Sequence, residues 1–259
     1  MKNCVLLLNP QNDFLSINGS YTQKEHVEVE QLSQVFNEID ADGIVLMMDS
    51  HYPMDISHSN YWIDFEGNHP AVGTKITKRE AKGRKYCVFM PGAPKNVVEE
   101  KQKLAVEYLE NIESIGLSHH IVPNHCIIGT WGHGVHPMIM NDVIRWSNDK
   151  GRDYQMMSKG IYQHSEHIGA FEAVVPDPNI PETMLNQGIL QYLDNFENVY
   201  IWGPSDVLLA SMKQLEDCSN VLDAPDIIER YVVLTSNDQI KQYCDTVGFK
   251  TTTLKELNS

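Results

Sequence analysis

The sequence predicts an α/β protein with a mostly parallel sheet and helices on both of its faces. Short apolar runs alternate along the chain with segments that have helical spacing. The run from Ile44 to Met48 is apolar throughout, as expected of a strand that is buried on both faces. Strands separated by crossover helices favour parallel pairing, so we expect a three-layer sandwich.

The apolar runs and the helical patterns divide the chain into alternating elements. Helical spacing is clearest where Leu32, Val35, Phe36 and Ile39 recur on one helical face. The expected strands are residues 5–8, 44–48, 119–122, 154–157, 199–202, 231–234 and 250–253. The expected helices are residues 29–39, 97–115, 135–146, 184–193, 206–215 and 239–247.

The domain organisation follows from the length of the chain and from one irregular segment. A chain of 259 residues fits one large domain, and no linker divides it, so we expect a single domain over residues 1–259. Residues 52–94 lack clear periodicity and are rich in Pro, Gly and His. A segment of this length without periodicity predicts a functional insertion or a lid.

Composition narrows the range of partners and locations. The net charge of −15 makes nucleic acid an unlikely partner, because such a surface repels phosphate groups. No apolar run reaches the ~20 residues that span a membrane, and the start of the chain has no basic leader, so we expect a cytoplasmic protein. The five cysteines are scattered and include no CxxC pair, which argues against a disulfide framework or a structural zinc site.

Acidic and imidazole side chains follow the strand that ends at Met48. Asp49 and His51 are two residues apart, and side chains two apart in an extended chain point the same way. With His58 or another histidine they would form an N/O site for a divalent metal such as Zn, Fe or Mn. On spacing alone, a purely structural role for these residues is about equally well supported. By the same standard, Lys159 at a strand end is an ordinary solvated lysine.

Four segments together resemble the nicotinamidase and isochorismatase-like superfamily, and segments between them, notably YWIDFEGNHPA, are similar to its longer branch. The start CVLLLNPQNDF is similar to the family's D-x-Q-x-D-F, and MMDSHYPMDISH is similar to its metal motif. The segment VPNHCIIGT matches P-x-H-C-x-x-G-T, and MSKGIYQHSEHIGAF is similar to the family's K-G segment. The resemblance covers nearly the whole chain and implies the isochorismatase-like α/β sandwich.

The resemblance also implies roles for individual residues. The family's catalytic triad is Asp, Lys and Cys, in which the thiolate attacks an amide and the carboxylate handles the proton. The lysine of that triad falls on Lys159. The ligands of the family's metal ion fall on Asp49, His51 and His125, with His58 as a fourth.

Two triad positions depart from the family pattern. The aspartate position is occupied by Asn9, whose amide does not take up a proton at neutral pH. The alignment of VYIWGPSDVLLAS on Ser211 places the nucleophile position at Val207, or at Leu208 if the register slips by one. The turn before it is about two residues shorter than in the longer branch of the family. Since that turn supplies the family's oxyanion hole with backbone N–H groups, the resemblance does not imply an intact oxyanion hole here. Without the aspartate, Lys159 is expected to bond the amide oxygen of Asn9 or water.

Two functions are consistent with these departures. The first is a non-catalytic relative that keeps a metal or small-molecule pocket and acts as a binding or assembly subunit. The second is a hydrolase of a small, nicotinamide-like amide that uses metal-bound water or another base, with Glu166 and His167 as the first candidates. In either case a homo-oligomer or a place in a larger complex is expected.

Overall fold

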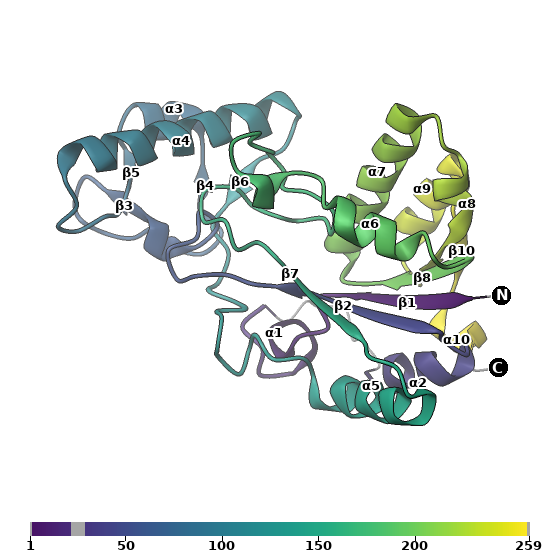
Figure 1. Cartoon of the computed structure of the whole chain (residues 1–259). Coiled ribbons are helices and arrows are strands. Elements are labelled where there is room, and N and C mark those ends of the chain that lie inside the picture. Colours follow the sequence, from purple (N-terminus) through teal and green to yellow (C-terminus); the bar gives the residue numbers. More distant parts are fainter. Residues whose placement is uncertain (1, 22–28, 258–259) are drawn as a thin grey trace.

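A six-stranded parallel sheet lies at the centre of the computed structural model, which describes residues 2–21 and 29–257. Its strands run in the order β10-β9-β8-β1-β2-β7 (Figure 1). The strand bounds are Asn3–Leu8 (β1), Gly43–Asp49 (β2), Gln155–Lys159 (β7), Asn198–Trp202 (β8), Tyr231–Leu234 (β9) and Lys250–Thr252 (β10). β2 is buried along its whole length, as its uninterrupted apolar sequence predicts.

Helices cover both faces of this sheet, which confirms the predicted three-layer α/β fold (Figure 1). On one face, α2 and α5 pack against the sheet through apolar residues such as Phe36 and Trp146. On the other face, α7 and α9 pack through residues such as Met212 and Ile240. The helix bounds are Asn12–Leu15 (α1), Val29–Glu38 (α2), Pro137–Lys150 (α5), Gln187–Leu193 (α6), Ser205–Leu222 (α7), Asp226–Arg230 (α8), Asp238–Val247 (α9) and Leu254–Leu257 (α10).

The segment that follows β2 and runs as far as β6 forms a smaller lobe beside the sheet (Figure 1). Its elements are the 3-10 turn Ser59–Tyr61, β3 (Trp62–Asp64), β4 (Lys75–Ile76), α3 (Lys78–Lys82), β5 (Tyr86–Val88), α4 (Lys95–Ser114) and β6 (His119–His120). They bury an apolar core of their own, built around Trp62 and Tyr108. The expected strand at residues 119–122 is therefore shorter than predicted, and it pairs antiparallel with β4 outside the central sheet.

Parallel pairing brings several polar residues to one edge of the sheet. Asp49 and Lys159 end β2 and β7 and are register partners, and Asn9 follows β1 directly. The turn that leads from β8 into α7 carries the chain to Val207 at the same edge. This is the edge where parallel sheets place their ligands. Within the described part of the chain, no helix has the length and apolar character needed to cross a membrane.

Candidate metal centre and its adjoining cavity

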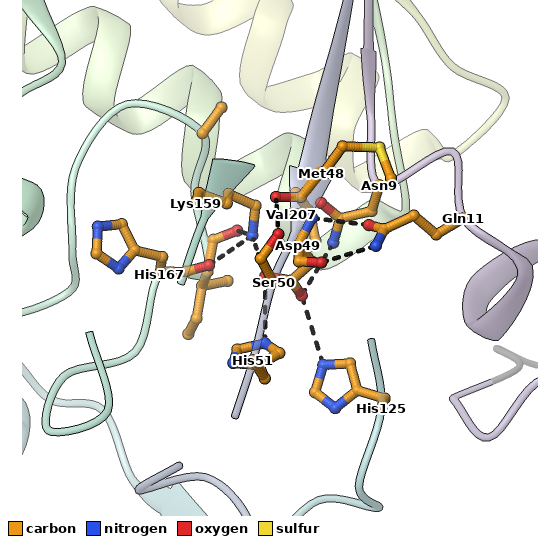
Figure 2. A network of polar contacts seen from close by, with 12 residues as sticks. Asn9, Gln11, Met48, Asp49, Ser50, His51, His125, Lys159, His167 and Val207 are labelled. Atoms are coloured by element: carbon orange, nitrogen blue, oxygen red, sulfur yellow. Dashed lines mark hydrogen bonds and ion pairs between the residues drawn. The ribbon is translucent and has the colours of Figure 1, made fainter. Parts of the chain in front are cut away.

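Three buried side chains bring ligand atoms together at the end of β2. One carboxylate oxygen of Asp49 and one ring nitrogen each of His51 and His125 lie within 4.8 Å of one another. Nε2 of His51 is 3.2 Å from Oδ1 of Asp49, and Nε2 of His125 is 3.4 Å from Oδ2 (Figure 2). The sequence motifs from two distant segments thus meet at one point.

Hydrogen bonds on the far sides of the two rings direct both Nε2 atoms toward Asp49. Nδ1 of His51 lies 3.1 Å from a carboxylate oxygen of Asp55. Nδ1 of His125 lies 3.0 Å from the carbonyl oxygen of Pro123, which can only accept, so this nitrogen carries the proton. A carboxylate oxygen and two imidazole nitrogens are a donor set that suits Zn, Fe or Mn. The residues present therefore fit a divalent metal ion.

His58 lies outside this group of ligand atoms. Its Nε2 is 3.2 Å from Nδ1 of His125, on the side of that ring that faces away from Asp49. Burial lowers the pKa of His58 to about 4, so the ring is neutral near pH 7. His58, the expected fourth ligand, thus contacts the His125 ring from behind and does not join the group of candidate ligand atoms.

Lys159 neutralises the buried carboxylate of Asp49. Its Nζ donates to Oδ1 of Asp49 at 3.1 Å and to the carbonyl oxygen of His167 at 2.6 Å (Figure 2). Burial alone would raise the pKa of Asp49, but the charges of Lys159 and His51 hold it well below its usual range. Burial likewise opposes protonation of His51, yet the charges of Asp49 and Asp55 prevail and raise its pKa to about 10.

The amide of Asn9 has a different partner from the one expected. Its Nδ2 lies 3.4 Å from Oδ2 of Asp49, and no bond joins it to Lys159, so the predicted Lys159–Asn9 contact is wrong. The reason is that Asp49 is a charged acceptor within reach of both groups. Asn9 has a left-handed backbone (φ 50°), and its Oδ1 is buried without a hydrogen-bond partner among the described residues.

A cavity of about 220 Å³ adjoins Asp49, His51 and His125. Asn9, Lys159 and Val207, the three positions at which the resemblance implies the family's triad, all line it. The other lining residues are Phe14, Tyr21, Asp49, His51, Ser57, Ser118, His120, Val122, His125, Glu166, His167, Ile168 and Asp206. Leu208 is not among them and is buried in the core of the α7 side, which favours Val207 as the equivalent of the nucleophile.

None of the five cysteines lines this cavity. Cys126 follows the ligand His125 directly, but its thiol is buried and burial raises its pKa strongly. Ser211, the residue that anchors the alignment, bonds the carbonyl oxygen of Val207 at 2.7 Å through its hydroxyl. No thiolate is therefore placed to attack a ligand in the cavity.

Residues that the sequence analysis did not single out hold the ligands in place. The side chain of Gln11 donates to the carbonyl oxygen of Asp49 and accepts from its N–H, both at 2.7 Å. Asp13 accepts the N–H of Cys126 at 2.6 Å and so fixes the loop that carries His125. Both residues belong to the segment that is similar to the family's D-x-Q-x-D-F, and this similarity could have identified them from the sequence. Gly160 (φ 79°) is required because a Cβ there would lie 3.0 Å from the His51 ring.

Burial shifts the pKa values of the two candidate bases, Glu166 and His167, in opposite directions. The hydroxyl of Tyr108 donates to a carboxylate oxygen of Glu166 at 3.0 Å. Burial, assisted by the charge of Asp55, raises the pKa of Glu166 to about 7 despite that hydrogen bond. Burial lowers the pKa of His167 to about 4, so Glu166 is better matched to proton transfer near neutral pH.

The Glu166 carboxyl predicts a distinct pH dependence of stability. The pKa of Glu166 is higher in the folded state than in the unfolded state, where it is near 4.5. The protonated carboxyl therefore contributes its full stabilisation below about pH 4.5, and this stabilisation is lost as the pH rises through about 7. Glu166→Gln cannot ionise and keeps an acceptor for Tyr108. Between about pH 5 and about pH 8, the wild type should lose on the order of 2 kcal/mol more unfolding free energy than this variant. Urea unfolding across this range measures the difference, and parallel profiles would contradict the assignment.

The fold has close counterparts among solved structures. No protein-family model matches the sequence, and no curated protein matches it. The structure of the yeast nicotinamidase aligns with a TM-score of 0.59 at 17% identity, covering 96% of this chain and 99% of that one. An Acinetobacter baumanii nicotinamidase/pyrazinamidase aligns with a TM-score of 0.56 at 17% identity, covering 99% and 98%.

The chain has the fold of the nicotinamidases. A third structure, of an L. infantum protein in complex with nicotinate, aligns with a TM-score of 0.52 at 14% identity, over 97% of this chain and 92% of that one. The predicted resemblance to the nicotinamidase and isochorismatase-like superfamily is thereby confirmed at the level of the fold.

Proposed function

We propose that this nicotinamidase-fold protein binds a divalent metal ion and a small molecule, and has lost the covalent chemistry of a cysteine hydrolase. The observation that carries the proposal is the side chain at the position equivalent to the nucleophile. Val207 lines the cavity there, beside Asn9 and Lys159. An isopropyl group has no lone pair to attack a carbonyl, and the Asn9 amide does not serve as the acid or base at neutral pH.

In the metal centre, Asp49, His51 and His125 would hold the ion, which we propose to be Zn, Fe or Mn. A bound divalent ion supplies a Lewis acid that attracts the lone pair of a ligand atom. Lys159 keeps the Asp49 carboxylate ionised and in place through its 3.1 Å contact. The preserved donor set supports a binding role, because a protein that used only the scaffold would not need it.

The cavity supports binding of a flat, N–H-donating small molecule. Asn9 lines the cavity, and its buried Oδ1, which has no hydrogen-bond partner among the described residues, would accept one hydrogen bond from a ligand that reaches it. The ring of Tyr21 stacks on His125 at 4.6 Å, and with Phe14 it makes one wall aromatic. We therefore propose a nicotinamide-like amide as the class of ligand, recognised through its amide N–H.

Zinc titration of metal-free protein tests the proposal. The wild type should bind one zinc ion, and His51→Ala should lose most of the affinity because it removes one of three ligands. His69→Ala is a suitable control, since that imidazole bonds the carbonyl oxygen of Trp62 in the smaller lobe. Equal zinc affinities of the wild type and His51→Ala would contradict the proposed site.

A second candidate function is hydrolysis of a small amide without a covalent intermediate. Glu166 favours it, because a carboxyl with a pKa near 7 faces the same cavity. In this role Glu166 would take a proton from the attacking water. Turnover that persists in thiol reagents but is lost in Glu166→Gln would support hydrolysis over a purely binding role.

A further inference from the structure

Asp55 lies directly behind the metal ligand His51. It follows His51 by four residues, and only 1% of its surface is exposed. Its Oδ2 is 3.1 Å from Nδ1 of His51, whose opposite nitrogen, Nε2, faces Asp49 at 3.2 Å. The imidazole ring is thus held between two carboxylates, of which only Asp49 belongs to the group of ligand atoms.

The position of Asp55 is fixed by contacts that do not involve the metal ligands. Its Oδ1 accepts the N–H of Ser57 at 3.0 Å and the hydroxyl of Ser57 at 2.7 Å. The next residue, Ile56, is tied by its N–H to the carbonyl oxygen of Gln163 at 2.9 Å. Its own carbonyl oxygen accepts the indole N–H of Trp62 at 2.7 Å. The carboxylate is therefore held in place independently of any ion.

We propose that Asp55 is a positioning residue for the metal ion. With a metal ion bound, Asp55 would accept the Nδ1–H of His51 and so select the tautomer whose Nε2 lone pair is available to the ion, and it fixes the plane of the ring. An anionic acceptor also strengthens the imidazole as a ligand. This inference rests on the proposed metal site at Asp49, His51 and His125.

The second imidazole ligand has weaker support, which makes the effect of Asp55 separable. Nδ1 of His125 meets the neutral carbonyl oxygen of Pro123 at 3.0 Å. Only His51 has a charged acceptor behind its ring. Replacement of Asp55 should therefore alter one ligand of the ion and leave the other in place.

The test is zinc titration of metal-free protein against a competing chromophoric chelator. Asp55→Asn keeps an acceptor but not the charge, and Asp55→Ala removes both. We expect zinc affinity to fall about 10-fold in Asp55→Asn and up to about 100-fold in Asp55→Ala. The visible spectrum of the cobalt-substituted protein should change in both variants. Asp42→Asn is the matched control, because Asp42 is a hydrogen-bonded carboxylate at the opposite end of β2.

The outcomes separate the role of Asp55 from the metal site itself. If the wild type binds zinc and Asp55→Ala binds it as tightly with the same cobalt spectrum, the positioning role is wrong and the proposed site stands. If the wild type binds no zinc, the proposed function fails and this inference fails with it. Should Asp55→Ala not fold, Asp55→Asn decides in the same way, and Ser57→Ala, which removes one donor to Asp55, should show a smaller loss.

Discussion

Incubation of the purified protein with nicotinamide is expected to release no measurable ammonia. Removal of a covalent nucleophile eliminates the acyl-enzyme route, and loss of triad members that act as a unit commonly costs several orders of magnitude. Val207 and Asn9 line the cavity, and the proposed function takes them as replacements of two such members. Thiol reagents should also change nothing, because no cysteine faces the cavity. The yeast nicotinamidase, assayed in parallel, is the positive control.

Restoring the missing groups should recover little of this activity. Val207→Cys together with Asn9→Asp would return a thiol and a carboxylate to the cavity. The short turn before α7 would remain, and misplacement of catalytic groups by about 1 Å can cost ~100-fold. Robust thiol-independent ammonia release by the wild type, abolished by a chelator or by Asp49→Ala, would contradict a purely binding role.

Replacing Asp49 by alanine is expected to abolish zinc binding and to destabilise the metal-free protein strongly. Asp49→Ala leaves the Lys159 ammonium, whose side chain is 3% exposed, with backbone carbonyl oxygens as its remaining partners among the described residues. Loss of one partner from a buried ion pair costs about 3–5 kcal/mol of unfolding free energy. Urea unfolding in the presence of a chelator measures this cost.

Two further variants define the origin of that loss. Adding Lys159→Met to Asp49→Ala removes the unpaired charge and should restore part of the stability. Glu107→Ala removes a carboxylate that pairs with Lys103 on the exposed surface of α4, and it should change stability by less than about 1 kcal/mol. A loss of similar size in Glu107→Ala and Asp49→Ala would contradict a special contribution of the buried pair to stability.

The central sheet was predictable because its strands are apolar and its helices strongly periodic. β9 has the predicted bounds, Tyr231–Leu234, and α9 begins one residue before the predicted start. The smaller lobe was not predictable in detail, because strands of two or three residues such as β4 and β6 are too short to show a period. Helix α8 was not predicted either, because it has only five residues and none of them is buried.

Residues of the candidate site that belong to a sequence motif could be predicted. Residues that belong to the site only because the fold brings them close could not. Asp49 and His51 share a strand end, and the resemblance added His125 from a distant loop. Asp55 gave no signal, since its relation to His51 depends on how the intervening loop turns. The predicted contact of Lys159 with Asn9 was wrong. Lys159 lies beside Asp49 because β2 pairs with β7, and the sequence does not show which strands pair.

The most direct measurement is anomalous diffraction at the zinc edge from crystals grown with zinc. We expect one peak between Asp49, His51 and His125, with coordinating atoms at about 2.0–2.2 Å from the ion. Lys159 should stay close to Asp49, and Nδ1 of His51 should still face Asp55. A fully occupied zinc ion elsewhere, with no peak between these three side chains, would contradict the account.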